Sequence, residues 1–215
     1  MTVHSSGLLI VCRHTESEWD LLGKLAGKVD SPLSDQGLLQ ADEIGELLKA
    51  VEFNVIYTSD QTRSKQTMQA IVGANEFETP PRFIHSALSE QDYGDLTGMN
   101  IEKALREYGV HRQELLKQSW SVRAPGGESL QMVSNRMLAF FTIEILPRLK
   151  TGKHVLVVAH AGAVISLVKH LLDISTDAID TVPSVGDRVF SFSFNPDGVV
   201  TDTDELPIKK SAQTT

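Results

Sequence analysis

The sequence predicts an α/β fold in which helices cover both faces of a mostly parallel sheet, giving a three-layer α/β/α sandwich. Two continuous apolar runs, at residues 8–12 and 154–159, have the pattern of strands that are buried on both faces. A shorter apolar run, at residues 53–57, lies between two helical patterns. Because strands that alternate with helices form βαβ units, these observations predict a largely parallel sheet.

The first two helical patterns flank the short strand. One begins after Ser34, a favourable N-cap residue, and the other begins near Ser59. Apolar residues three or four positions apart give each helix one buried face. In the first helix this face comprises Leu38, Ala41, Ile44, Leu47 and Leu48, and in the second it includes Met68 and Ile71.

Two further helical patterns surround the strand at residues 154–159. The earlier one begins after Pro125-Gly126-Gly127, takes Glu128 into its first turn and continues toward Pro147. The later one follows Gly162 and is strongly apolar. Both patterns have the length and spacing of helices packed on a sheet.

The C-terminal part of the chain predicts one more strand and a tail. Residues 188–194 alternate apolar and polar side chains, as a strand at a sheet edge does. Residues 201–215 are polar and are expected to be a flexible tail. The whole chain, residues 1–215, has the length of a single domain.

The composition excludes several classes of protein. A formal net charge of -8, without a run of basic residues, is wrong for a nucleic-acid-binding protein. Cys12 is the single cysteine, so an internal disulfide and a cysteine-based zinc site are excluded. With no apolar run long enough to span a membrane and no signal-peptide pattern, we expect a cytoplasmic protein without a membrane partner.

Two histidines mark the expected active edge of the sheet. The first strand runs directly into Arg13-His14 and the strand at residues 154–159 runs directly into His160. Ligands of open α/β sheets bind at the carboxyl ends of the strands, so both imidazoles should lie there. A metal site is one interpretation, but the guanidinium of Arg13 would repel a dication by about 4 kcal/mol per unit charge at contact range. Arginine beside histidine fits an anion better, and we expect no metal.

Arg63 and Gly162 extend the same interpretation. Arg63 lies about one turn into the second helix, so its side chain should point back over the same edge. Guanidinium groups bind phosphate oxygens in a bidentate manner. The helix after His160 would add backbone N–H groups, and Gly162 would let the anion approach closely. Together these residues form a candidate phosphate-binding site. Taken alone, a histidine at a strand end more often has a structural role, and Arg63 is more often a solvated helix arginine.

At this point the chain resembles a known family, the histidine phosphatase superfamily, and within it the cofactor-dependent phosphoglycerate mutases. The resemblance covers residues from about 8 to 200. The segments that carry it are Arg13-His14-Thr15-Glu16-Ser17-Glu18-Trp19-Asp20, Pro32-Leu33-Ser34-Asp35-Gln36-Gly37, Thr58-Ser59 with Arg63 and Thr67, Leu88-Ser89-Glu90-Gln91-Asp92-Tyr93-Gly94, Pro125-Gly126-Gly127-Glu128-Ser129, and Leu156-Val157-Val158-Ala159-His160.

The resemblance implies the mutase-like fold and a metal-independent phosphotransferase. His14 would carry the phosphoryl group, Glu90 would be the acid and base, and Arg13, Arg63 and His160 would stabilise the charge on the phosphoryl oxygens. Further residues implied to contact the substrate are Ser17, Ala26, Gly27, Tyr93, Lys117 and Gly162.

Several positions depart from the family pattern. Near the nucleophile, Thr15 replaces a glycine, Asp20 replaces an asparagine that would donate to phosphate, and Ala26 replaces a threonine. After the last histidine the usual Gly-Asn is Ala161-Gly162. At the far end of the substrate, the lysine and two arginines that would hold a carboxylate are replaced by Ile101 and Lys117-Gln118. Losing such charges weakens the selection of a carboxylate-bearing substrate.

Three functions stay open from the sequence. The first is a glycolytic mutase, an isomerase of 3- and 2-phosphoglycerate that is primed by 2,3-bisphosphoglycerate. The second is a phosphomonoester phosphatase, a hydrolase that passes the same phosphohistidine to water. The third is a noncatalytic relative that binds a phosphorylated molecule, which the residues Thr15, Asp20 and Ala26 would suggest. Each implies a small phosphorylated partner, and a homodimer is left open.

Overall fold

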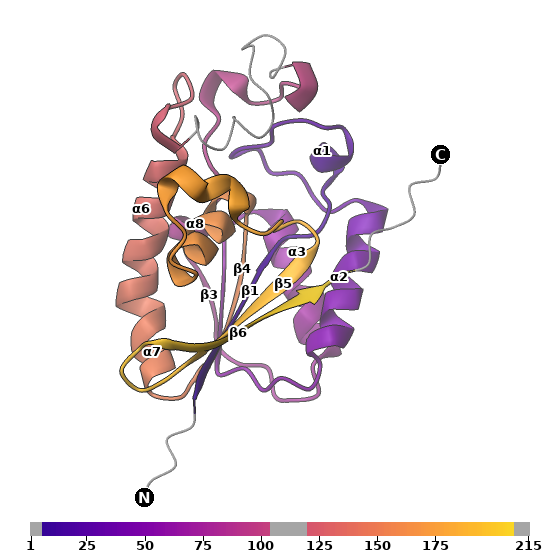
Figure 1. Ribbon diagram of the computed structural model, residues 1–215. Helices are drawn as coiled ribbons and strands as arrows, with labels where there is room; N and C mark the ends of the chain where they lie inside the picture. The colour runs from indigo at the N-terminus through magenta and orange to yellow at the C-terminus, as the bar shows by residue number, and fades with distance from the viewer. Residues whose placement is uncertain (1–5, 104–119, 209–215) are drawn as a thin grey trace, which may run out of the picture.

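A computed structural model, which describes residues 6–103 and 120–208, has the predicted architecture of helices on both faces of one mainly parallel sheet (Figure 1). The six strands lie in the order β3-β2-β4-β1-β5-β6. The first four in this order run parallel, whereas β5 and β6 are antiparallel additions. Their bounds are Gly7–Arg13 (β1), Val55–Thr58 (β2), Arg82–Ile84 (β3), His154–Ala159 (β4), Arg188–Phe194 (β5) and Val200–Pro207 (β6).

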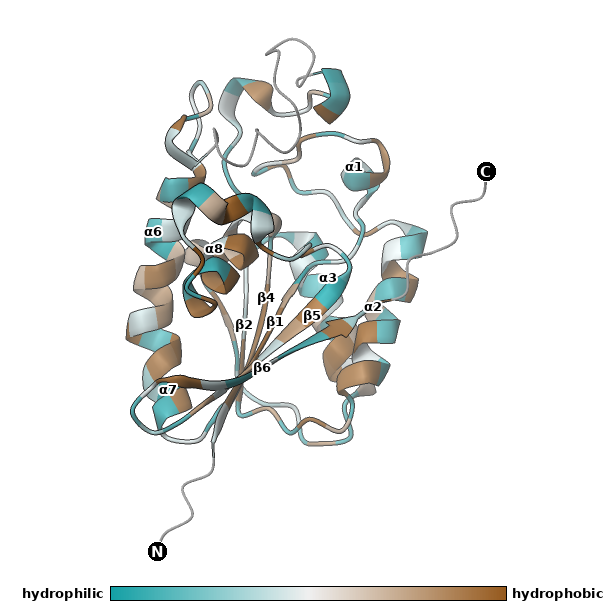
Figure 2. Cartoon of the chain, in the orientation of Figure 1, coloured by the Kyte–Doolittle hydropathy of each residue, from teal (hydrophilic) through white to brown (hydrophobic). Residues whose placement is uncertain are grey.

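The helices form the two outer layers. In Figure 1, α6 and α8 cover one face of the sheet while α2 and α3 cover the other, and α1 lies beyond the strand ends. Figure 2 shows apolar residues, in brown, along α2, α6 and α8, and the buried ones among them pack in the hydrophobic cores on the two faces of the sheet. None of the helices in the described parts of the chain is long and apolar enough to cross a membrane. The bounds are Glu18–Leu21 (α1), Asp35–Leu48 (α2), Thr62–Ala74 (α3), Leu130–Phe140 (α6), Leu146–Lys150 (α7) and Ala161–Leu171 (α8), with short turns Ser86–Leu88 (η1), Gly94–Leu96 (η2), Phe141–Ile145 (η3) and Thr176–Thr181 (η4).

Two predictions for the last part of the chain, an edge strand at residues 188–194 and a tail from residue 201, are wrong. β5 is an inner strand, and the edge is formed by β6 at Val200–Pro207, where a tail was expected from residue 201. β6 escaped prediction because its side chains are mostly exposed and polar, as its colour in Figure 2 shows. It forms by pairing with β5 along its length. The short strand β3 also lacked a signal, because its three residues are exposed.

The helix predictions need three corrections. Ser129 is the N-cap of α6 and accepts from the amide of Met132, so Glu128 precedes the helix. Pro147, which cannot donate a backbone hydrogen bond, lies at the start of α7 after the π-helical turn η3. On α2, Leu38 and Leu47 are 43% and 42% exposed, so the buried stripe is narrower than predicted.

The pairing of β1 with β4 positions the expected active edge. Arg13 lies opposite Ala159 in this parallel ladder, and the amide of His14 donates to the carbonyl oxygen of Ala159 at 2.9 Å. The residue after each strand is a histidine, so the register brings His14 and His160 side by side. On the other side of β4, Thr58 at the end of β2 pairs with Val158.

A close backbone contact fastens the segment after His14 to α2. Gly37, in the first turn of α2, lies against the backbone of Glu16, where an added Cβ would be 1.8 Å from the Glu16 carbonyl oxygen. The Gly37 carbonyl accepts a hydrogen bond of 2.7 Å from the Thr15 hydroxyl. A side chain at position 37 would therefore force this segment away from α2.

We predict that Gly37→Ala lowers the free energy of unfolding by about 3 kcal/mol, because the backbone cannot accommodate the methyl group. Urea denaturation measures this loss. Gly73→Ala is the matched control, since no atom lies within 4 Å of its added Cβ. This second helical substitution should be neutral or stabilise by about 0.5–1 kcal/mol. Equal changes in the free energy of unfolding for the two substitutions would show that the contact of Gly37 with the Glu16 backbone does not contribute to stability.

Candidate active site

Five of the residues singled out in the sequence lie around one site. The rings of His14 and His160 have centroids 4.9 Å apart at an interplanar angle of 61°. Nitrogen or carboxylate atoms of His14, Glu90 and His160 all lie within 4.8 Å of one another. Arg63 reaches the same place from the first turn of α3, and Arg13 from the end of β1. His14, Arg63, Glu90 and His160 are all buried.

The hydrogen bonds of His14 determine where its proton lies. Nδ1 is 2.7 Å from the carbonyl oxygen of Thr15, which can only accept, so Nδ1 carries the hydrogen. Nε2 in turn accepts from Nε of Arg63 at 3.1 Å. A neutral imidazole with these partners has its electron pair on Nε2, where the Arg63 N–H is bound to it. The site therefore presents a nucleophilic nitrogen that is held in one orientation from both sides.

Arg63 is fixed by backbone oxygens of one loop. Nη1 donates to Val29 at 3.0 Å and Nη2 donates to Gly27 at 3.1 Å. Gly27 has φ +52, a left-handed conformation that glycine adopts without strain, and this orients its carbonyl toward the arginine. Arg63 is 1% exposed, so its guanidinium holds a positive charge beside the nucleophile away from solvent.

Arg13 is paired with Asp20. Its Nη2 donates to Oδ1 of Asp20, while Oδ2 accepts from the amide and the hydroxyl of Ser17 at 2.9 and 2.6 Å. Burial raises the pKa of Asp20, but the charge of Arg13 and the hydrogen bonds from Ser17 outweigh it, so the net pKa is lowered. The carboxylate is therefore ionised and turned toward Arg13 and Ser17.

Both histidines are neutral in this environment. Burial lowers the pKa of His14 well below its ordinary value of 6.5, and the charges of Arg13 and Arg63 lower it further. The pKa of His160 is also lowered well below 6.5. The largest cause is again burial, followed by the electrostatic influence of His14 and Arg63. The nucleophile thus keeps its electron pair at neutral pH.

The backbone around Glu90 is held from two sides. Its amide donates to the side-chain oxygen of Gln61 at 3.0 Å, and its carbonyl accepts from Nη2 of Arg136 at 3.1 Å. Arg136 is paired with Glu128, which also accepts from the amide of Asp92 at 3.0 Å. The carboxylate of Glu90 itself accepts from the amide of Gln91 at 2.8 Å. Sequence analysis missed Gln61 and Arg136 as positioning groups, since their contacts are with distant backbone.

Thr15, the residue that replaces a glycine after the nucleophile, is accommodated without strain. Its φ is not positive: among the described non-glycine residues, positive φ occurs at Asp173 alone. Its hydroxyl donates to Gly37 and lies 3.4 Å from that of Thr67, whose Oγ1 also accepts from the Thr15 amide at 3.2 Å. The bulk of Thr15 therefore points into the packing under α2.

The residues expected to contact substrate differ in their placement. Gly27 binds Arg63, and Tyr93 packs against Gly27, since a Cβ there would be 3.3 Å from the Tyr93 ring. The hydroxyl of Ser17 is engaged by Asp20, and the amide of Gly162 lies 3.4 Å from Oε1 of Glu90.

Ala26 and Lys117 are the remaining two residues that were expected to contact the substrate. Ala26 is half-buried and its carbonyl accepts from the amide of Val29, with no side-chain donor to offer. Lys117 lies outside the described residues, as does Gln118.

The same donors could in principle coordinate a metal ion. His14, Glu90 and His160 are the residue types of a zinc site with two imidazoles and one carboxylate. Both nitrogens of His14 are already hydrogen-bonded, however, and the buried charge of Arg63 lies directly beside it. Nε of Arg13 and Nδ1 of His160 are buried without a hydrogen-bond partner among the described residues. A guanidinium N–H can be satisfied by an anion and not by a cation, so the site fits an anion.

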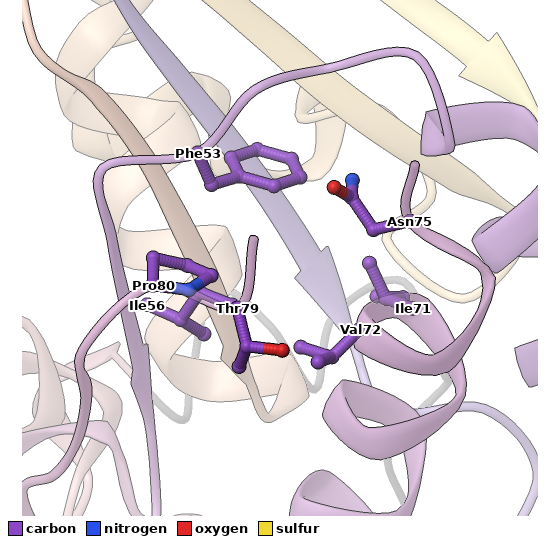
Figure 3. A pocket seen from close by; sticks show the side chains of 7 residues that line it. All are labelled: Phe53, Ile56, Ile71, Val72, Asn75, Thr79 and Pro80. Carbon is purple, nitrogen blue, oxygen red and sulfur yellow. The ribbon is translucent and has the colours of Figure 1, made fainter. Parts of the chain in front are cut away.

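A separate pocket lies away from these residues. It is lined by Phe53, Ile56, Ile71, Val72, Asn75, Thr79 and Pro80, and Figure 3 shows its mainly apolar walls. The Asn75 side chain donates to the carbonyl of Val51 at 2.9 Å and is thus used within the fold. The pocket contains no titratable side chain, and we assign the chemistry to the histidine site.

Comparison with known proteins gives a consistent result. The sequence profile of the histidine phosphatase superfamily (branch 1) matches residues 9–201. A 2,3-bisphosphoglycerate-dependent phosphoglycerate mutase of Xanthobacter autotrophicus is 37% identical over 177 residues, which make up 81% of this chain and 86% of that protein.

Two solved structures show the same fold. The phosphoglycerate mutase from Bacillus anthracis superposes with a TM-score of 0.77 at 22% identity, covering 94% of this chain and 93% of its own. The alpha-ribazole phosphatase from Shigella flexneri has a TM-score of 0.73 at 22% identity, covering 95% and 100%.

We predict that the free energy of unfolding falls as the pH drops below about 6.5. The folded-state pKa of His14 and of His160 is lowered, so the unfolded chain binds more protons in this range and acid favours unfolding. Each histidine contributes at most about 1.4 kcal/mol per pH unit. In urea denaturation between pH 7.5 and 5.5, His14→Gln should have a shallower slope than the wild type. If the free energy of unfolding of His14→Gln depends on pH as steeply as that of the wild type, the lowered pKa of His14 is not the cause of this dependence.

We also predict that Asp20→Asn tightens the binding of inorganic phosphate about tenfold, or about 1.4 kcal/mol. The amide would remove a negative charge from the anion site and release Arg13 from its ion pair. Isothermal titration calorimetry measures the dissociation constant. Glu144→Gln is the control, because it breaks an arginine–carboxylate pair with Arg148 in α7, which packs against Gly7 at the opposite end of β1, and it should leave the affinity unchanged. Unaltered or weaker binding by Asp20→Asn would refute the prediction.

Proposed function

Because the chain belongs to the histidine phosphatase superfamily (branch 1), we propose that it interconverts 3- and 2-phosphoglycerate by carrying a phosphoryl group on Nε2 of His14. Enzymes of this superfamily act as phosphotransferases or phosphatases. The observation that carries the proposal is the pairing of His14, with Nδ1–H bonded to Thr15 and the electron pair of Nε2 accepting from Nε of Arg63. A buried, neutral and oriented imidazole is the group that a covalent phosphoryl carrier needs.

In the first half-reaction, Nε2 of His14 attacks the phosphorus atom of the donor. The N–P bond forms as the bond to the leaving oxygen breaks, and Glu90 gives that oxygen a proton. The N–H of Arg63 that now bonds Nε2 turns to a phosphoryl oxygen, because the electron pair it was bound to has been used. Nε of Arg13 and Nδ1 of His160, which have no hydrogen-bond partner in the described part of the chain, stabilise the remaining negative charge.

In the second half-reaction, the phosphoryl group passes to an acceptor hydroxyl. Glu90, now ionised, removes the proton from that hydroxyl, whose oxygen attacks phosphorus as the N–P bond breaks. His14 returns to its neutral form and the proton balance is restored. For a mutase, 2,3-bisphosphoglycerate would supply the first phosphoryl group, which is the cofactor in the printed name of the 37% identical Xanthobacter relative.

A second candidate is a phosphomonoester phosphatase, in which water replaces the acceptor hydroxyl. Ile101 favours it, because this position would carry a lysine in a mutase that holds the substrate carboxylate, and isoleucine cannot bind a carboxylate. The fold is also compatible with this activity, since one neighbour of similar TM-score is a phosphatase. The placement of Thr15 away from the nucleophile argues against a noncatalytic relative, because its bulk leaves the electron pair of His14 free.

Incubation with 2,3-bisphosphoglycerate should give an acid-labile phosphoryl adduct on His14, detected by mass spectrometry, that is absent from His14→Ala. For the mutase, addition of 3-phosphoglycerate then yields 2-phosphoglycerate in an assay coupled to enolase. For the phosphatase, the adduct decays to inorganic phosphate with no enolase signal. His154→Ala, which changes a histidine at the opposite end of β4, is the matched control and should keep the adduct. Absence of any adduct would refute both functions.

A further inference from the structure

A chain of buried hydroxyl groups leads from the end of β2 to the second imidazole. Oγ1 of Thr58 donates to Oγ of Ser64 at 3.1 Å, and Ser64 lies 2.6 Å from Oγ of Ser59. Ser59 in turn is 2.7 Å from Nε2 of His160. The three hydroxyl residues are at most 1% exposed, so bulk solvent does not reach these bonds.

The proton of Ser59 has two possible acceptors, and its choice decides the tautomer of His160. Ser59 already accepts from the amide of Gln61 at 3.2 Å. If Ser64 donates to Ser59, the Ser59 proton goes to Nε2 of His160, whose hydrogen then lies on Nδ1. If Ser64 donates to the carbonyl of Gln61, 3.0 Å away, Ser59 donates to Ser64 and His160 carries its hydrogen on Nε2.

Two observations favour the first arrangement. The carbonyl of Gln61 already accepts from the amide of Lys65 at 3.2 Å, so it does not depend on the Ser64 proton. Nδ1 of His160 is buried and has no partner among the described residues, as is the case for Nε of Arg13 in the same site. A bare electron pair at Nδ1 would repel the anion that Arg13 and Arg63 are placed to hold, whereas an N–H would bind it.

We propose that Ser59 is a positioning residue that donates to Nε2 of His160 and so fixes the tautomer whose Nδ1–H binds a phosphoryl oxygen. The inference rests on the proposed phosphoryl transfer and assigns its second imidazole the role of a neutral donor. Backbone pairing holds the geometry, since Thr58 pairs with Val158 and the next residue of each strand continues toward the site. A donor without charge suits a site where two guanidinium groups already disfavour a third cation.

The tautomer can be measured directly on the wild-type protein. We expect 15N NMR of protein labelled at histidine, with saturating inorganic phosphate, to show a protonated Nδ1 and an unprotonated Nε2 for His160. The signals are assigned by their loss in His160→Gln. A protonated Nε2 with a bare Nδ1, or protonation of both nitrogens, would overturn the proposal.

Two serine variants separate positioning from packing. Ser59→Ala should lose the fixed tautomer and slow phosphorylation of His14 by roughly tenfold to a hundredfold, the usual effect of removing a group that orients a histidine. Ser64→Ala deletes an equally buried hydroxyl but leaves the Ser59 proton free for His160, so it should keep the wild-type tautomer. If both variants keep the tautomer, or both lose it, Ser59 has no special role. Thermal unfolding of each variant shows whether the fold is retained.

The outcome is distinct from that of the functional assay. Phosphate binding and the NMR tautomer do not require turnover, so a protein that forms no adduct on His14 can still show the expected state of His160. Conversely, an active mutase or phosphatase with the opposite tautomer would retain the proposed function and refute the role of Ser59.

Discussion

The arrangement of the site depends on the parallel pairing of β1 with β4. The two strands are in register so that Arg13 pairs with Ala159. The hydrogen bond from the His14 amide to the Ala159 carbonyl extends this pairing one residue beyond β1. Since each strand is continuous and apolar, both are buried on both faces and cannot shift without exposing their core side chains. Two imidazoles that are 146 positions apart in the chain are thereby held as neighbours by backbone geometry alone.

The charges around these imidazoles then decide what they can bind. Arg63 is buried and its donors are divided among His14 and two backbone carbonyls. Arg13 shares its charge with Asp20, which the family pattern would have as an amide. The site thus combines a fixed buried cation with a partly neutralised one, and the histidines between them remain uncharged. Such a site binds an anion while leaving one nitrogen free to react.

Much of the architecture could be predicted from the sequence, because the central strands and their helices have strong periodic patterns. β1, β4, α2 and α8 follow directly from apolar runs and cap residues. The failures have physical causes: β3 and β6 are exposed edge strands whose stability comes from pairing, and Leu38 and Leu47 show that an apolar stripe can be wider than the buried face. Family membership could also be predicted, since the motifs occur in order along the chain.

The site itself could be predicted in part. Motif residues at strand ends identified His14 and His160, and the start of the following helix identified Arg63, but spacing gives no information about which hydrogen bonds a side chain makes. The pairing of Asp20 with Arg13, the contact of Gln61 with the Glu90 backbone and the hydroxyl chain through Ser59 depend on three-dimensional proximity. These contacts determine protonation and orientation, and they are the part that required coordinates.

The position of Thr15 has a consequence for how this chain tolerates sequence change. Its side chain shares space with Gly37 and Thr67, two positions on different helices, and none of the three hydrogen bonds they form involves the nucleophilic nitrogen. A side-chain substitution at position 15 therefore acts through these packing partners, while the backbone carbonyl of this residue continues to hold Nδ1 of His14. Substitutions at positions 15, 37 and 67 should covary as a group, independently of the residues that touch substrate.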